Sequence, residues 1–433
     1  MTTQKIAGSL RIFVYIGLLF AGVLLTGLSG CPEEPFSVVV LETNSVEDQG
    51  QVWPYYLVRL KVAGKQASYA QWFPSQNLYP APVVMLTQPY DTINWSGELI
   101  DYFQGDALPP DEYYGTASYF LHHGFSVLFV FGRFYAGGDI QNEVDDMAAG
   151  LKFLSQEASV DKAKIAIYGS SWGGFEALYA AANAPPEAIP VAGVATYPLS
   201  DFEAWVNHLI DIPNKVTDPE KISEYETHFA PFVDRIYATT GGPPGDGSDY
   251  TEWNLSGLLN NLQTPFLVLH DVWDTLVPFE QSSDLVEQAN HLVEPVWFLY
   301  EEPPDLNTLP LDHGAMMTDG YAFPFYGTLT FAYLFTRIGL ADQELYIFYD
   351  QTALHDFLVY LKGFQIQGYD MNWAAPRLLD LVDKRVLMYE LTLDPPQIDS
   401  GACVIVQAIN EIWGTSLTQQ TVVAALAQGL PIP

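Results

Sequence analysis

The sequence predicts an α/β fold with a mostly parallel, doubly wound sheet, and two patterns along the chain carry that prediction. Beyond about residue 82, short and nearly continuous apolar runs recur, which is typical of strands buried on both faces of a parallel sheet. Between them, apolar residues follow helical spacing, as at Val144, Met147, Leu151 and Leu154. Strands that alternate with helices indicate βαβ units. The expected parallel strands cover residues 83–87, 125–131, 165–168, 191–196, 266–270 and 296–300.

Three segments before this region have the composition of antiparallel strands. Residues 37–42, 54–62 and 66–73 are rich in β-branched and aromatic side chains, and the last of them follows a Gly64-Lys65 turn. We expect these segments at one edge of the sheet. The interval 199–264 is too long for a simple connection between two strands. Insertions of this length usually form lids or caps, so we expect a helical cap over about residues 199–262.

Composition describes a folded protein with an acidic surface. The chain has 433 residues, of which 49% are hydrophobic and 16% charged, so it can bury a large core. Its formal net charge is −35 because it has only 17 lysines and arginines. A nucleic-acid-binding protein needs a basic footprint, and this composition argues against nucleic acid as a partner.

The first thirty residues have the pattern of an export signal. Lys5 and Arg11 precede an apolar run over residues 12–28, followed by small residues. The run ends at Leu28-Ser29-Gly30-Cys31, which resembles the bacterial lipobox. The resemblance implies that residues 1–30 are a lipoprotein signal peptide, that Cys31 carries lipid, and that residues 31–36 are a tether at the bacterial cell envelope. A cleaved signal without lipid and an uncleaved transmembrane helix are the alternatives.

A candidate nucleophile lies where an expected strand runs into an expected helix. The segment Gly169-Ser170-Ser171-Trp172-Gly173 follows the apolar run 165–168 and precedes a helical pattern to about residue 183. A G-x-S-x-G motif in this context is the nucleophile elbow of the α/β-hydrolase fold. Its small residues let strand and helix approach, and the N–H of Trp172 would face a developing oxyanion. Ser171 is therefore the expected nucleophile, with a simple glycine-rich turn as the alternative.

An acid and a base follow in the order that this fold uses, which is serine, acid and then histidine. Asp274 lies in the loop beyond the strand expected at 266–270 and is the expected acid, with Asp271 as the alternative. His313 follows the last expected strand and is the expected base. The remaining histidines are expected on the surface or in packing: His122, His123, His208, His228, His270, His291 and His355. Such a triad needs no metal or organic cofactor, and the sequence has no zinc-spaced set of ligands and no phosphate-binding loop.

The second oxyanion donor is expected in the loop that follows residues 83–87. That loop has the sequence Gln88-Pro89-Tyr90-Asp91. Either the hydroxyl of Tyr90 or a backbone N–H nearby could donate, and the alternative is that Tyr90 only packs.

The chain resembles the catalytic domain of the prolyl oligopeptidase family over about residues 82–340. The matching segments are 132–138, 145–164, 169–175 and 262–278. The loop at Tyr90 also resembles that of cocaine esterase and Xaa-Pro dipeptidyl-peptidase relatives, which implies that its hydroxyl helps to form the oxyanion hole. The chain departs from both groups, because it has no room for the β-propeller or jelly roll that they carry, and His270-Asp271 stands where the family usually has His-Gly.

These observations predict an exported serine hydrolase with a catalytic domain over residues 37–340 and a C-terminal extension over 341–433. Carboxylic ester hydrolysis is the first expectation, on a small-molecule ester or short peptide substrate. A serine peptidase and an inactive hydrolase-fold binding protein are the alternatives. A peptidase of this kind needs an acidic anchor for a peptide N-terminus, which Glu203 or Glu224 in the cap could supply, although surface charge is the expected role of both.

Overall fold

The computed structural model describes the part of the chain that holds the expected catalytic domain. The described residues are 36–48, 51–76, 79–87, 117, 120–245, 247–272, 274–289, 291–298, 313, 327, 330–331, 333–335, 337–338, 410, 416 and 418. Cys31 and Tyr90 lie outside them, as does nearly all of the segment 341–433. None of the helices in these ranges is long and apolar enough to cross a bilayer.

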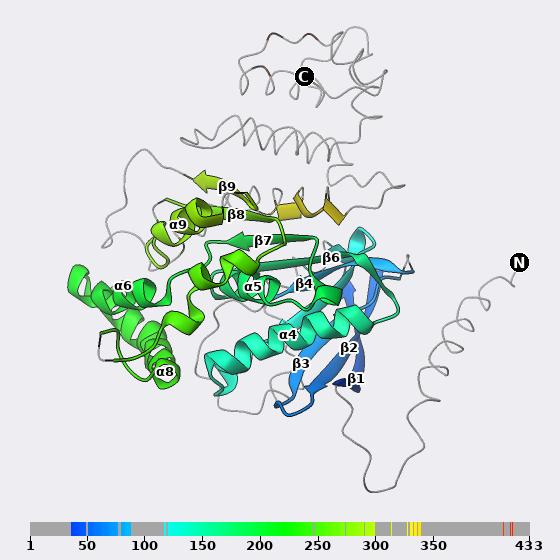
Figure 1. The fold of residues 1–433 in the computed structure, drawn as a ribbon, viewed down its shortest axis with the longest axis horizontal. Helices are drawn as coiled ribbons and strands as arrows, with labels where there is room; N and C mark the ends of the chain where they lie inside the picture. Colours follow the sequence, from blue (N-terminus) through cyan, green and yellow to red (C-terminus); the bar gives the residue numbers. More distant parts are fainter. Residues whose placement is uncertain are drawn as a thin grey trace, which may run out of the picture.

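The described strands form one mixed sheet in the order β1-β2-β3-β5-β4-β6-β7-β8-β9 (Figure 1). The pairs β1–β2, β2–β3 and β3–β5 are antiparallel. The pairs β5–β4, β4–β6, β6–β7, β7–β8 and β8–β9 are parallel. The strands are β1 (Phe36–Asp48), β2 (Gln51–Val62), β3 (Ser68–Phe73), β4 (Ala81–Leu86), β5 (Ser126–Phe131), β6 (Val160–Ser170), β7 (Ala192–Thr196), β8 (Phe266–Asp271) and β9 (Val293–Phe298).

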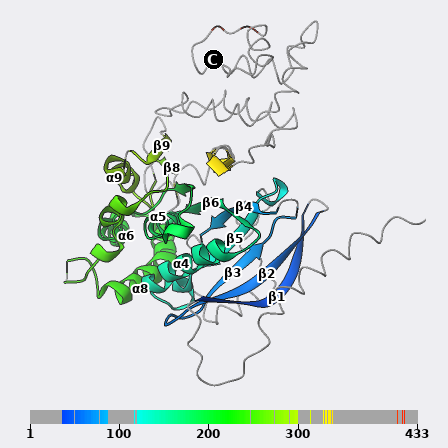
Figure 2. The same ribbon diagram turned by 45° about the vertical axis from the view of Figure 1, so that its right-hand side comes forward.

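The helices complete a doubly wound α/β domain. They are α4 (Ile140–Gln156), α5 (Trp172–Ala182), α6 (Phe202–Lys215), α7 (Pro219–Glu224), α8 (Ala230–Thr240) and α9 (Glu280–Ala289). Short helical turns are η1 (Arg133–Ala136), η2 (Pro186–Ala188), η3 (Tyr225–Phe229), η4 (Thr251–Trp253), η5 (Leu255–Gly257) and η6 (Leu259–Asn261). Helices α4 and α5 lie side by side on one face of the sheet (Figures 1 and 2).

Both faces of the central strands are buried, as the apolar runs predict. Every residue of β4, β5 and β8 is buried. Val83 and Met85 of β4 belong to the core beneath α4 and α5. Because successive residues of a strand point to opposite faces, the residue between them points to the other face of the sheet. On the other face, Phe125 stacks on Phe335 with ring centroids 4.9 Å apart. Helical residues from beyond β9 therefore cover the second face.

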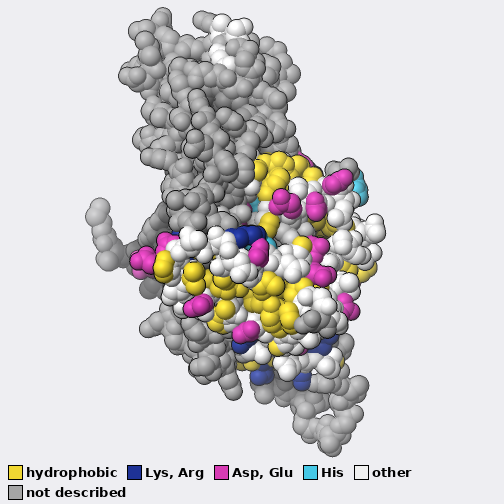
Figure 3. Space-filling model, turned by 90° about the vertical axis from the view of Figure 1, so that its left-hand side faces the viewer, with side chains coloured by type: hydrophobic (Ala, Val, Ile, Leu, Met, Phe, Trp, Pro, Cys, Tyr) yellow, Lys and Arg dark blue, Asp and Glu magenta, His cyan; other side chains and the backbone are white. Residues whose placement is uncertain are grey.

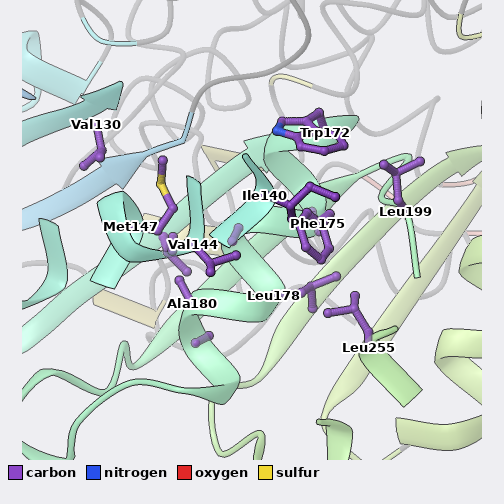
Figure 4. Close-up of a cluster of buried hydrophobic side chains, with 14 of the residues drawn as sticks. Val130, Ile140, Val144, Met147, Trp172, Phe175, Leu178, Ala180, Leu199 and Leu255 are labelled. Atoms are coloured by element: carbon purple, nitrogen blue, oxygen red, sulfur yellow. The ribbon is translucent and has the colours of Figure 1, made fainter. Parts of the chain in front are cut away.

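The core beneath α4 and α5 determines where helix α5 lies. Phe175 and Leu178 of α5 belong to this core together with Ile140 of α4 and Leu255 (Figure 4). Helix α4 begins at a capping box, in which the Asp139 carboxylate accepts the Asn142 N–H at 2.7 Å. Both helices are thus fixed against the sheet, and α5 begins directly at the end of β6.

Several strand boundaries differ from the sequence prediction, and those of β9 and β6 are examples. Strand β9 begins at Val293, three residues before the expected start, and includes Pro295. Proline is tolerated at an edge strand because its missing N–H need not enter a ladder, and β9 is the last strand of the described sheet. Strand β6 begins at Val160, five residues early, because its polar residues lie at the exposed amino end.

The interval between β7 and β8 is helical and lies at the carboxyl ends of the parallel strands (Figure 1). It contains α6, α7, α8 and the turns η3 to η6. On the face drawn in Figure 3, hydrophobic side chains gather near the middle and acidic side chains lie around them, with few lysines and arginines.

Candidate active site

Ser171 lies at a sharp turn between β6 and α5. Its backbone has φ 55° and ψ −122°, a conformation that non-glycine residues rarely adopt. Hydrogen bonds fix the turn on both sides, since the Ser171 N–H donates to the Thr196 carbonyl at 2.8 Å and its own carbonyl accepts the Gly174 N–H at 2.9 Å. The serine therefore has the strained strand-to-helix geometry of a nucleophile elbow.

The approach of strand and helix at this turn excludes a side chain at position 169. A Cβ on Gly169 would lie 2.1 Å from the Gly173 carbonyl oxygen and 2.2 Å from the Thr87 hydroxyl. The Thr87 hydroxyl donates to that same carbonyl at 2.7 Å, which ties the end of β4 to the elbow. Sequence reasoning missed Thr87, whose only signal is its place as the last residue of an expected strand.

Asp274 lies in the loop beyond β8 and pairs with His313. One carboxylate oxygen, Oδ2, is 2.8 Å from His313 Nδ1. The other, Oδ1, accepts the N–H groups of Leu276 at 2.8 Å and Val277 at 2.7 Å. Burial alone would raise the pKa of Asp274, but the neighbouring imidazoles and their hydrogen bonds outweigh burial and hold the pKa well below its ordinary value. The carboxylate is thus charged and oriented toward His313.

A second imidazole touches the same carboxylate. His270, fully buried in β8, has its Nε2 3.4 Å from Asp274 Oδ2, and its Nδ1 is 2.6 Å from the Ser282 hydroxyl. The expectation that His270 only packs is therefore incomplete, because it also lies against the acid. Asp271, the alternative acid, is buried at the end of β8, and its carbonyl accepts the Asp274 N–H at 3.1 Å. Of these two acids, the structure pairs Asp274 with His313.

Tyr197 connects His313 to the elbow. The Tyr197 and His313 rings are stacked, with centroids 3.9 Å apart and planes 18° from parallel. Tyr197 follows Thr196, whose carbonyl holds the N–H of Ser171. Ser171 follows β6, Tyr197 follows β7 and Asp274 follows β8, so all three lie at the carboxyl ends of the parallel strands. The strand order reverses between β4 and β6, and such switch points are where ligands bind in open α/β sheets.

Trp172 joins the elbow to the helical insertion. Its backbone N–H belongs to the first residue of α5, where helix geometry leaves N–H groups without an intrahelical acceptor. Its ring packs against Phe134 at 4.8 Å, Phe232 at 5.1 Å and Phe202 at 5.6 Å. Phe202 and Phe232 belong to α6 and α8, so the residue after Ser171 anchors the insertion to the sheet.

The buried carboxyl of Glu143 accepts a hydrogen bond from the Trp172 indole. Glu143 of α4 accepts the Trp172 Nε1–H at 3.2 Å with one oxygen and the Phe134 N–H at 2.7 Å with the other. Burial raises the pKa of Glu143 above its ordinary value, although a hydrogen bond with Glu176 of α5 and the other donors oppose this shift. Burial therefore favours the protonated form of the Glu143 carboxyl.

Next to this pair lies a buried ion pair in the segment that resembles the prolyl oligopeptidase family. Arg133 Nε is 2.7 Å from one Asp146 oxygen, and the Arg133 N–H donates to the other at 2.8 Å. These contacts fix the turn after β5 against α4. Such a pair is poor evidence for stability by itself, so we assign it a role in fixing geometry.

Helix α6 of the insertion holds the loop that carries the acid. The Trp205 indole donates to the Leu276 carbonyl at 3.1 Å, and His208 Nε2 is 2.8 Å from the Thr275 carbonyl. Burial lowers the pKa of His208, and because a carbonyl only accepts, its Nε2 carries the proton. His208 was expected on the surface or in packing, and the structure shows that it also holds the acid loop. Glu203 is exposed and Glu224 half-buried.

Among the described residues, no cluster of histidine, cysteine and acidic side chains could hold a metal ion. His313 is described, but the residues around it in sequence are not. The roles expected for Ser171, Asp274, His313 and Trp172 stay predictions, and those of Tyr90 and Cys31 fall on residues outside the described ranges.

Comparison with known proteins supports the resemblance expected from the sequence. A family model described as X-Pro dipeptidyl-peptidase (S15 family) matches residues 66–210, a range that runs from just before β3 into α6 and includes Ser171. No curated protein matches the sequence. With its sheet topology and elbow, the chain has an α/β-hydrolase fold.

Several solved structures are similar at low identity. Dipeptidyl peptidase 4 of Porphyromonas gingivalis matches 57% of this chain at 18% identity with a TM-score of 0.40, and the chain covers only 32% of that protein. An esterase of Pyrococcus furiosus matches 66% of this chain and 92% of its own at 18% identity, with a TM-score of 0.45. Acylaminoacyl peptidase of Pyrococcus horikoshii matches 76% of this chain and 44% of its own at 15% identity, with a TM-score of 0.45.

Proposed function

We propose that the protein is a serine hydrolase that cleaves carboxylic esters through an acyl-enzyme on Ser171. Two observations support this proposal: the strained elbow at Ser171, and the buried Asp274–His313 pair, in which Asp274 Oδ2 lies 2.8 Å from His313 Nδ1. A reactive serine needs a base that is itself oriented by a third group, and this arrangement supplies both.

Each step of the proposed reaction has a residue to perform it. His313 Nε2 takes the proton of Ser171 as the serine oxygen attacks the ester carbonyl carbon, and the Trp172 N–H donates to the oxyanion that forms. The tetrahedral intermediate collapses as His313 gives the proton to the leaving alcohol. His313 then takes a proton from water as the water attacks the acyl-enzyme, and it returns that proton to the Ser171 oxygen as the carboxylic acid leaves. Asp274 holds the imidazole through Nδ1 in the tautomer that presents Nε2 to the serine.

The second oxyanion donor is proposed to be the Tyr90 hydroxyl. The support is the resemblance of Gln88-Pro89-Tyr90-Asp91 to the corresponding loop of cocaine esterase and Xaa-Pro dipeptidyl-peptidase relatives. Thr87, which immediately precedes this segment in the sequence, donates to the Gly173 carbonyl of the elbow.

A serine peptidase is the second candidate, because the matching family model is one of dipeptidyl-peptidases. Such an enzyme needs a buried acidic anchor for the substrate ammonium group. Glu203 is exposed and Glu224 is only half-buried, which does not favour that role for either, and we therefore place ester hydrolysis first.

A substrate panel separates the two candidates. We expect full-length protein in detergent to hydrolyse p-nitrophenyl acetate and butyrate with a higher kcat/KM than Gly-Pro or Ala-Pro p-nitroanilide. The Ser171→Ala variant should lose activity by a factor on the order of 10⁶. Faster turnover of the anilides would move the assignment to a peptidase. A folded wild type without activity on any of them would favour a binding protein.

We also propose that the protein is exported and held at the bacterial cell envelope by lipid on Cys31, facing the periplasm or the exterior. The lipobox-like segment after an apolar run supports this proposal. Cells that express the protein with a radioactive fatty acid should label wild type and Cys403→Ser but not Cys31→Ser. A wild-type protein without label would contradict lipidation.

A further inference from the structure

Tyr197 has a backbone conformation that tyrosine rarely adopts. Its φ is +40°, and among the described residues only Tyr197 and Ser171 are non-glycine residues with positive φ. Strain of this kind persists where the surroundings fix it, and it gathers at functional sites. Here the Tyr197 N–H donates to the Leu269 carbonyl at 2.6 Å, and the preceding carbonyl, of Thr196, accepts the Ser171 N–H. The strained segment thus joins β7 to both β8 and the elbow.

The strained backbone directs the Tyr197 ring onto His313. The stack at 3.9 Å and 18° is a face-to-face contact, and the Tyr197 side chain is buried. The same ring lies edge-on to His270, with centroids 6.4 Å apart and planes at 77°. A glycine at this position would carry no strain, so the feature gained from tyrosine is its aromatic face against the imidazole.

We infer that Tyr197 is a positioning residue for His313, whose ring face holds the imidazole plane and stabilises the imidazolium that forms during the reaction. This inference rests on the proposed function of His313 as the base. The Asp274 hydrogen bond fixes only one atom of the ring, Nδ1, and leaves rotation about that bond. A stacked aromatic face restricts that rotation, and its quadrupole attracts a cation.

Other titratable groups also surround His313, and the test must separate their effects from that of Tyr197. Asp274 bonds to His313 directly, His270 shares the Asp274 carboxylate, and His208 contacts the acid loop through Thr275. Replacing Tyr197 by leucine leaves all three in place. Leucine keeps an apolar side chain and the same backbone strain but has no aromatic face, whereas phenylalanine keeps the face.

The experiment compares Tyr197→Leu, Tyr197→Phe and wild type in full-length protein. We expect Tyr197→Leu to lower kcat on the order of tenfold with little change in KM, and to shift the acid limb of kcat/KM to lower pH. Tyr197→Phe should keep the kcat and pH profile of wild type. Tyr179→Leu, which removes a half-buried tyrosine packed on Phe175, is the control for a general loss of packing.

A spectroscopic signature tests the stack without turnover. In protein with isotope-labelled histidine, the ring protons of His313 should resonate upfield in wild type and Tyr197→Phe, because they lie over an aromatic face. In Tyr197→Leu that shift should disappear. His313→Asn identifies the resonance.

Two failures would be distinguishable. If wild type is active and Tyr197→Leu keeps the wild-type kcat, pH profile and His313 resonance, the inference is wrong while the proposed function stands. If wild type neither turns over ester nor reacts with a serine-directed probe, the proposed function fails, and a positioning role for Tyr197 fails with it.

Discussion

Replacing Asp274 by asparagine is expected to lower kcat for ester hydrolysis by about 10⁴-fold while KM changes little. The hydrogen bonds of the loop give the reason. Asp274 Oδ1 accepts two backbone N–H groups, from Leu276 and Val277, so the oxygen of an asparagine would stay there. Its amide nitrogen would then face His313 Nδ1 and force the proton of that ring onto Nε2. A protonated Nε2 cannot take the proton of Ser171.

Asp271→Asn is the matched control, since Asp271 is the alternative acid and is also buried. Steady-state kinetics of both variants on p-nitrophenyl butyrate decide between them, with circular dichroism to verify folding. A large loss in Asp271→Asn together with near wild-type turnover in Asp274→Asn would show that the acid is assigned to the wrong residue.

Gly169→Ala is expected to disrupt the elbow itself. The added Cβ would lie 2.1 Å from the Gly173 carbonyl oxygen, which is backbone and cannot swing away. Overpacking of this kind lowers the free energy of unfolding by about 1–3 kcal/mol or more. Displacing Ser171 by as little as about 1 Å would further reduce kcat on the order of 10²-fold.

Calorimetry and ester kinetics measure the two effects separately. Gly257→Ala serves as the control, because no heavy atom lies within 4 Å of the Cβ that it would add. We expect its melting temperature and kcat to match those of wild type. If Gly169→Ala were equally neutral, β6 and α5 would not approach each other at residue 169 as closely as the structure shows.

The parts of the site that sequence predicts are those with local signals. Ser171 is recognised because strand, motif and helix are contiguous, and Asp274 and His313 follow from their order after expected strands. Thr87, His270 and Tyr197 are recognised only in three dimensions. Each acts through a residue at least four positions distant along the chain, and no local pattern marks it.

The ends of the strands also depend partly on contacts that no local sequence pattern marks. Strand β1 extends to Asp48, well beyond the expected end at residue 42. The prediction ends early because the last part of the strand contains polar side chains such as Asn44 and Glu47. A two-stranded pairing with β2 continues through them by backbone hydrogen bonds, which do not depend on hydrophobicity. The positive φ of Tyr197 could not be predicted either, since tyrosine disfavours it and tertiary contacts impose it.

We propose that Ser171 is a nucleophile activated by His313. The most direct measurement is reaction of full-length wild type with a fluorophosphonate, followed by intact mass and peptide mapping. The claim predicts one adduct per chain, on Ser171, with none in Ser171→Ala and greatly slowed reaction in His313→Asn. A folded wild type that forms no adduct, or an adduct on Ser170 or elsewhere, would contradict it.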